Sequence, residues 1–501
     1  MVRIKRQHSV LKERVNSAVQ LEHLAYVDAA SDKADAALAS GNPVAVYAAV
    51  RDLMPKGPRP TVRVKMGDGR PAPSYVDERS RFRAHFAGLL GGSAVPFSDL
   101  VAEGRGDHVP SDLCVKIGGA SMNSIPSMAP LVCELAHAKC GKAVGEDGIG
   151  GEVFKVAPWS LARVWHPLFV KSALTLRPPL QFRGGMITEL LKASASGSEP
   201  GHFRDITIAD HSAKTFCKMF RPEIVSAAAA VVPAGQFGGG FNGGSTDVAH
   251  LALSAFLDAA SAARKSAAII FVDLATAFAS LLRRLCVPTD AGDDQWLGAL
   301  AAAGFSDNEV KHIYDEAASY AYWGRTGLSG HTLHIAAALH RMTWFTTEGL
   351  PNVVRTSRGS QAGMSLADVM FIAAAGRVAD QVAEGLAAAG VTARLPHDAA
   401  ACLFSDGCAG ACRDVLHVYY VDDGAIPVVA PARDLAVHIA KAACVVADVY
   451  CKFGFELKAG PNKTAVLVQW RGDGAITEQR RMQSGTKVRL KREPVRAPPF
   501  D

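Results

Sequence analysis

Two adjacent aspartates, Asp422 and Asp423, lie between two short apolar runs, and this segment restricts the local fold more than any other. The runs 416–421 and 425–429 are rich in β-branched and aromatic residues, and the Asp-Gly step between them is the strongest short-range signal for a β-hairpin. The sequence therefore predicts a hairpin with both carboxylates at its tip. An ordinary solvated turn is the alternative, because Tyr-x-Asp-Asp arises by chance in about 3% of chains of this composition.

A third carboxylate, Asp273, ends the apolar run 268–272, which predicts a buried strand. A buried, unpaired carboxylate is costly, so Asp273 requires a cation or a cluster of hydrogen-bond donors. The two hairpin aspartates repel each other and also require a positive charge. Together, the three carboxylates are the ligand set that a two-metal phosphoryl-transfer site needs. Two Mg²⁺ ions about 3.5–4 Å apart suit these hard oxygen ligands, with Mn²⁺ as the alternative ion.

The composition is that of a globular protein. The 501 residues are 49% apolar and 20% charged, which allows a large core and excludes a mostly disordered chain. The net charge of +6 permits a polyanionic partner without requiring one.

Ten cysteines and a charged N-terminus without an apolar leader indicate free thiols in a reducing compartment. No run reaches the ~18 apolar residues of a membrane span, so we expect no membrane partner.

Six blocks of sequence occur in a fixed order between residues 62 and 470, and they include Gly-Glu-Asp-Gly-Ile, Phe-Val-Asp-Leu-Ala-Thr-Ala-Phe and Tyr-Val-Asp-Asp. The blocks lie at 141–155, 192–207, 236–247, 271–278, 420–423 and 455–464. Each block is weak alone. In this order, however, they resemble the reverse transcriptases of non-LTR (LINE-type) retrotransposons.

The resemblance implies an α+β fold, namely a right-hand polymerase with fingers and palm, a helical N-terminal extension and an incomplete or absent thumb. It divides the chain into a helical region at 1–90, fingers and palm at 91–470, and a basic tail at 471–501. The implied activity is RNA-directed DNA polymerisation, in which a DNA primer is extended with deoxynucleoside triphosphates on an RNA template. The implied setting is intracellular, and it is nuclear if the chain shares the family's target-primed integration.

The resemblance also implies roles for individual residues. Asp273, Asp422 and Asp423 would bind the two metal ions. Lys463 would protonate the leaving pyrophosphate, although a plain surface lysine fits that position equally well. Phe278 would lie under the incoming sugar and exclude a 2′-hydroxyl group. The other substrate-binding residues implied are Lys192 and Arg204 on the triphosphate, and Tyr420, Gly359, Gln361 and Gly363 near template and nucleotide.

Several positions depart from the family pattern. Residues 358–368 lack the usual Gln-Gly pair followed by Pro and Ser, which puts template handling in doubt. Residues 242–246 lack the arginine that normally precedes Ser-Thr. The spacing from Asp273 to Asp422 is wide, with insertions near 306–342 and 380–414.

Alternative interpretations stay open. The chain could be a fragment of a longer polyprotein, or a catalytically decayed remnant that at most binds nucleic acid. Phe278 and the Val-Asp-Asp context speak against an RNA-dependent RNA polymerase.

The cysteines and histidine at Cys402, Cys408, Cys412 and His417 could bind zinc, but their spacing is not a standard one, so free thiols are the alternative. No GxxxxGK[ST], HExxH or GxSxG motif offers another catalytic centre.

Overall fold

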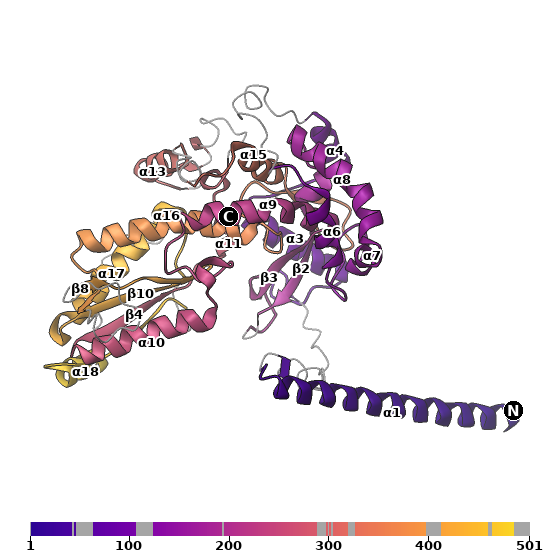
Figure 1. Ribbon diagram of the computed structural model, residues 1–501, viewed down its shortest axis with the longest axis horizontal. Helices are drawn as coiled ribbons and strands as arrows, with labels where there is room; N and C mark the ends of the chain where they lie inside the picture. The colour runs from indigo at the N-terminus through magenta and orange to yellow at the C-terminus, as the bar shows by residue number, and fades with distance from the viewer. Residues whose placement is uncertain are drawn as a thin grey trace. The chain divides into compact units, whose positions relative to one another are not determined.

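The computed structural model describes residues 2–42, 45–46, 64–106, 124–192, 195–287, 297–298, 300–301, 304–318, 326–396, 412–458 and 463–484. The chain forms two compact units, Met1–Arg63 and Val64–Asp501. In the first unit, α1 (Val2–Ala39) is a single helix of 38 residues, about 57 Å long (Figure 1). Leu21, Leu24 and Leu38 on this helix are more than half exposed.

The larger unit begins at Val64, whereas the sequence placed the end of the helical N-terminal region at residue 90. The difference comes from α3 (Tyr75–Leu89), which buries Phe82 and Phe86. These two rings pack in one apolar cluster with Phe345 and other residues of the larger unit. The apolar side of α3 therefore belongs to the core of the larger unit, and the division into helical region, fingers and palm, and basic tail stays a prediction.

A four-stranded antiparallel sheet with the order β11-β4-β10-β9 forms one part of the larger unit. Its strands are β4 (Ser266–Val272), β9 (Val418–Tyr420), β10 (Asp423–Ala430) and β11 (Ala465–Gln469). β4 has a partner on each side, and its pairing with β10 runs from Val272 opposite Gly424 to Ser266 opposite Ala430. The buried strand predicted at 268–272 is confirmed.

The side chains of β4 alternate between two helical layers. Ala268, Ile270 and Val272 join the main core, which also includes residues of α16 (Ala367–Ala388) and α17 (Ala432–Lys452). Ala267 and Ile269 pack instead with α10 (Thr246–Ala262). Figure 1 shows α16 and α17 on one side of the sheet and α10 on the other. Because both faces are covered, the strand is apolar throughout rather than alternating with polar residues.

A second sheet has five strands in the order β1-β6-β5-β2-β3. β2 pairs antiparallel with β3 and parallel with β5, so it joins segments that are far apart in the sequence. β7 and β8 form a separate two-stranded sheet. The bounds of these strands are β1 (Ser93–Val95), β2 (Gly184–Leu191), β3 (Phe203–Ile208), β5 (Trp344–Thr346), β6 (Val353–Arg355), β7 (Arg394–Pro396) and β8 (Cys412–Asp414).

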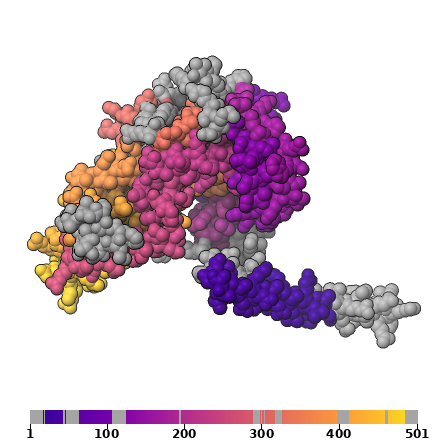
Figure 2. All heavy atoms as spheres, in the orientation of Figure 1, coloured from indigo at the N-terminus to yellow at the C-terminus, as the bar shows by residue number. Residues whose placement is uncertain are grey.

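Helices surround both sheets, so the fold is α+β as expected. Further helices in the described ranges include α4 (Phe97–Gly106), α6 (Met128–Ala136), α7 (Gly151–Val156), α8 (Pro158–Thr175), α9 (His211–Ala229), α11 (Ala277–Ser280), α13 (Asp307–Ala318), α15 (Gly330–Leu339) and α18 (Ala475–Gln483), together with the 3-10 helices η2 (Leu180–Arg183), η3 (Pro200–His202), η4 (Phe241–Gly243) and η5 (Arg283–Leu285). Figure 2 shows the surface of the larger unit hollowed between the segment around α10 and the purple segments of α6 to α8. Among the described residues, no helix has both the length and the apolar character needed to cross a membrane.

Candidate active site

The predicted hairpin is formed by β9 and β10, but its turn lies two residues earlier than the Asp-Gly step suggested. Tyr420 pairs with Asp423, so Val421 and Asp422 are the two turn residues. Gly424 lies inside β10, opposite Tyr419. A Cβ atom at Gly424 would lie in ordinary van der Waals contact with the Tyr419 ring, at 3.4 Å, so the strand position itself does not require glycine. The prediction that both carboxylates occupy the tip is therefore wrong for Asp423, which begins the strand.

Val421 occupies an unfavourable backbone conformation at this tip. Its φ of 59° is rare for a β-branched residue. The side chain of Gln236 holds it there: Gln236 Oε1 accepts from the Val421 N–H at 2.9 Å, and Gln236 Nε2 donates to the Val421 carbonyl at 3.3 Å. Gln236 is only 2% exposed. A buried amide thus fixes the turn that carries Asp422.

Asp273 directly follows β4 and lies beside the hairpin. Continuing the pairing of Val272 with Gly424 by one residue places Asp273 opposite Asp423, on the same side of the sheet. The backbone of Asp273 is held by Lys458, whose N–H donates to the Asp273 carbonyl at 2.8 Å. Thr464 Oγ1 accepts from the Asp273 N–H at 3.3 Å. We call Asp273, Asp422 and Asp423 the carboxylate edge.

The charges of the carboxylate edge act on one another. Burial raises the pKa of Asp422 above its ordinary value, and the nearby charge of Asp273 raises it further. Burial also raises the pKa of Asp423, with added contributions from Asp422 and Asp273. Arg204 opposes both shifts. The three carboxylates therefore lie close enough to repel each other, and the cationic side chains near them do not fully compensate.

The predicted basic residues lie around this edge. Lys463 Nζ forms an ion pair with Asp273 at 2.9 Å. Lys192, at the end of β2, donates to the Gly201 carbonyl at 2.6 Å. Its pKa is lowered by burial first and then by the positive charges of Lys458, Lys463 and Arg204. These cations thus form a single basic group next to the carboxylates.

The donors of the carboxylate edge suit a hard divalent cation, since all are carboxylate oxygens. Burial first, and then the charges of neighbouring carboxylates, raise the pKa values of Asp422 and Asp423, and a bound cation would stabilise both groups in their charged form. However, within the described ranges no three His, Cys, Asp or Glu side chains are close enough together to hold a metal ion. Asp273 is instead engaged by Lys463. A metal ion at this edge would therefore compete with that ammonium group.

Phe278 lies in α11, five residues after Asp273, and is partly buried. It lies against the main core, with its ring centroid 5.1 Å from that of Phe371 on α16. Tyr420, at the end of β9, is 36% exposed. Both side chains are partly exposed to solvent. Their expected contacts with a nucleotide and template stay predictions.

The segment 356–363 supplies the three other residues implied by the resemblance. Gly359 and Gly363 have φ values of 75° and 102°, and a Cβ atom would meet the backbone of Ala279 at 2.9 Å and of Thr207 at 2.3 Å, respectively. Both glycines are thus explained by close approach to the protein's own backbone. Gln361 is 5% exposed and donates to the Trp344 carbonyl at 2.9 Å.

Sequence reasoning assigned no role to Gln236, Thr464 or Lys458. Each lies within or beside a block that carries the resemblance, but their contacts are with backbone atoms of the hairpin and of Asp273. Such contacts depend on register between segments far apart in the chain. No local pattern in the sequence signals them.

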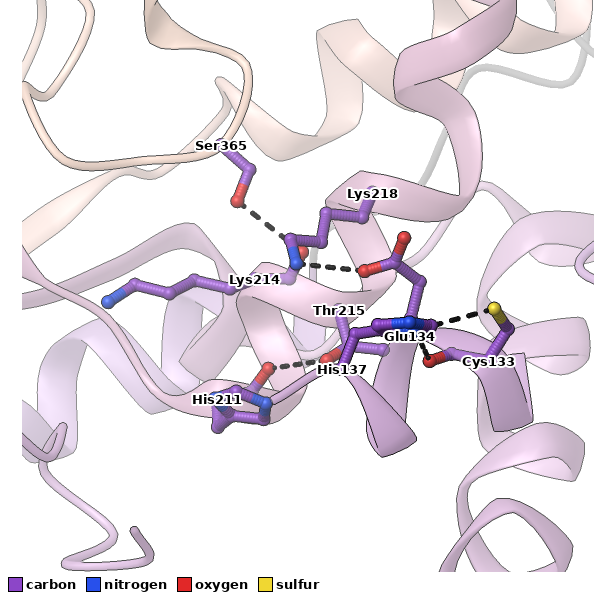
Figure 3. Close-up of polar contacts among 8 residues, drawn as sticks. All are labelled: Cys133, Glu134, His137, His211, Lys214, Thr215, Lys218 and Ser365. Carbon is purple, nitrogen blue, oxygen red and sulfur yellow. Dashed lines mark hydrogen bonds and ion pairs between the residues drawn. The ribbon is translucent and has the colours of Figure 1, made fainter. Parts of the chain in front are cut away.

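A second polar cluster joins α9 to its neighbours and lacks the repulsion of the carboxylate edge. Figure 3 shows Lys218 of α9 paired with Glu134 of α6, at 2.8 Å, and Ser365 donating to the Lys214 carbonyl. One turn further along α9, Arg221 binds both carboxylate oxygens of Asp368 at 2.7 and 2.6 Å. We call the pairs Lys218–Glu134 and Arg221–Asp368 the α9 anchor. Each carboxylate there has a cation of its own.

The suggested zinc ligands are only partly described. Cys402 and Cys408 lie outside the described residues. Cys412 is an exposed free thiol on β8. Burial lowers the pKa of His417 to about 4, so this imidazole is neutral near pH 7. A zinc site at these four residues therefore stays a prediction.

No protein-family model matches the chain, and no curated protein matches its sequence. The family resemblance thus remains a hypothesis that rests on the six blocks.

Proposed function

We propose that the chain is an RNA-directed DNA polymerase, with the four-stranded sheet as its palm and the five-stranded sheet within its fingers. One observation supports this most. Residues from four separate blocks come together in one electrostatically connected group at the end of β4: Lys192, Arg204, Asp273, Asp422, Asp423 and Lys463. Opposite charges gathered in this way suit a reaction in which a polyanionic substrate meets metal-binding carboxylates.

In this proposal each side chain has a distinct task. Arg204 and Lys192 bind the triphosphate, because fixed positive charge stabilises the charge that develops on the departing pyrophosphate. Lys463, held 2.9 Å from Asp273, is placed to donate a proton to that leaving group. Phe278 excludes a 2′-hydroxyl group from the sugar position.

Asp273, Asp422 and Asp423 are the residues that would hold Mg²⁺. The bound ions would supply the charge that activates the 3′-hydroxyl group of the primer and neutralises the pyrophosphate. The hairpin contributes by fixing Asp422: Gln236 holds the strained turn, so the carboxylate is positioned before substrate binds.

Primer extension tests the proposal directly. The purified chain is given poly(rA)/oligo(dT), Mg²⁺ and dTTP, beside the Asp422→Asn, Asp423→Asn variant. A matched control is Asp434→Asn, Asp448→Asn, which removes two carboxylates from α17 instead. Extension that only the first variant abolishes supports the proposal. Extension that survives the first variant contradicts it.

A second candidate is a nucleic-acid-binding protein without catalysis. The ion pair between Lys463 and Asp273 favours it, because one carboxylate is already neutralised by the protein itself. In the same preparations, salt-sensitive binding of the template–primer without any extension would support this candidate over the polymerase.

A further inference from the structure

Arg283, in η5, is a buried cation bound by neutral acceptors. It is 7% exposed, and all five N–H groups of its guanidinium are used. Nε donates to the Gly359 carbonyl at 2.8 Å and Nη2 to the Arg358 carbonyl at 2.8 Å. The other acceptors are the carbonyls of His340 and Thr356, at 3.3 and 3.2 Å from Nη1, and Thr356 Oγ1, at 3.0 Å from Nη2.

This arrangement is energetically unusual. A buried charge is normally paired with an opposite charge, yet no acceptor of Arg283 is a carboxylate. Burial alone lowers the pKa of Arg283 to about 9. Lysine has three donors and no planar fork, so it could not satisfy the same set of acceptors. Four of its five hydrogen bonds thus go to the loop 356–360, and the fifth goes to the His340 carbonyl.

That loop in turn holds the segment that carries Phe278. The Gly359 N–H donates to the Leu281 carbonyl, and the Ser360 N–H donates to the Phe278 carbonyl, both at 2.9 Å. The loop carbonyls therefore bind Arg283, while its amides bind residues 278–281. The close approach of Gly359 to Ala279, where a Cβ atom would be 2.9 Å from Cα, leaves little room for the loop to shift.

Phe278 is consequently fixed from two directions. Its backbone is bound by the loop, and its ring lies against Phe371 of α16. We propose that Arg283 is a positioning residue that sets the place of Phe278 through the loop 356–360, and thereby the discrimination between deoxynucleotides and ribonucleotides. This inference rests on the proposed polymerase function. Arg283 itself touches no substrate.

The test compares Arg283→Lys with the wild-type chain. The readout is the ratio of kcat/KM for dTTP to that for UTP on poly(rA)/oligo(dT). The ratio should fall roughly tenfold, with kcat for dTTP changed less than about threefold. Arg377→Lys is the matched control, because Arg377 joins α16 to Glu316 of α13 away from the loop. The control ratio should stay at the wild-type value.

Two further measurements separate positioning from general damage. With Phe278→Ala already present, Arg283→Lys should leave the ratio unchanged, because both changes act on one side chain. Hydrogen exchange in Arg283→Lys should become faster at 278–283 and 356–361 while the protection of other segments stays at the wild-type level. A ratio that stays at the wild-type value, or faster exchange throughout the chain, overturns the inference.

The two proposals can fail separately. If the wild-type chain incorporates neither nucleotide, the proposed function fails. The exchange experiment still decides whether Arg283 holds the loop and residues 278–281, since it needs no activity.

Discussion

The carboxylate edge and the α9 anchor use the same kinds of residue to opposite effect. In the anchor, Arg221 binds both oxygens of Asp368, and Lys218 pairs with Glu134. At the edge, burial raises the pKa values of Asp422 and Asp423, and repulsion from neighbouring carboxylates raises them further. The anchor therefore contributes stability, whereas the edge costs stability. Such uncompensated charge is typical of a site that binds an ion or does chemistry.

Among the variants that compare the edge with other cations and carboxylates one at a time, a large effect is expected at Lys463. Replacing it by methionine keeps most of the unbranched side chain but removes the ammonium group that contacts Asp273. Primer extension should fall about 100-fold, which is the lower end of the usual contribution of a general acid. Lys441→Met on α17 is the control and should extend primers at the wild-type rate. Equal rates for both variants would place Lys463 outside the chemistry.

The next effect concerns the turn that carries Asp422. Gln236→Met keeps the volume but leaves the Val421 N–H and carbonyl without their side-chain partner. The free energy of unfolding should fall by about 1–3 kcal/mol. Extension should fall about tenfold, because the strained turn is no longer fixed. Urea denaturation and primer extension measure the two losses. A stability loss with unchanged extension would mean that the strained turn is not needed for catalysis.

The anchor should show the reverse pattern. Arg221→Ala removes the paired hydrogen bonds to Asp368 and one to the Ser365 carbonyl. Because the pair is partly exposed, we expect a loss of about 1 kcal/mol in urea denaturation. The folded protein should extend primers at the wild-type rate. A strong loss of extension in the folded variant would remove the distinction between the two clusters.

The smallest effect is a gain in stability at the carboxylate edge. The raised pKa of Asp423 means that the folded state binds protons more readily than the unfolded state, whose value is near 3.8. Stability is therefore lost as pH rises from 3.8 through the raised value. Asp423→Asn should raise the melting temperature by about 1–3 °C at pH 7 and by less at pH 4. A lower melting temperature at pH 7 would show that the carboxylate is compensated.

Local patterns predicted part of this site. The apolar run before Asp273 indicated a buried strand because both faces of β4 are covered. The hairpin was also foreseen, but its turn residues were not. Gln236, distant in sequence, stabilises the turn at Val421, and the glycine that suggested a later turn lies inside β10, opposite Tyr419.

Other features depend on contacts that no local pattern encodes. The parallel pairing of β2 with β5 and the burial of α3 in the larger unit both join segments far apart in the chain. Arg283 is a further case, since its role depends on the carbonyls of a loop more than 70 residues later. The sequence predicted which charged residues are candidates for the site, but it did not predict the contacts that hold them in place.

The central claim is that Asp273 and the hairpin aspartates act as one site. Single-turnover incorporation of dTTP on poly(rA)/oligo(dT) should be measured for Asp273→Asn, for Asp422→Asn, and for the variant with both changes. If they form one site, each single change should reduce the rate by about 10³-fold or more, and the combined variant should lose little beyond that. Losses that multiply, or a single variant that retains the wild-type rate, would contradict the claim.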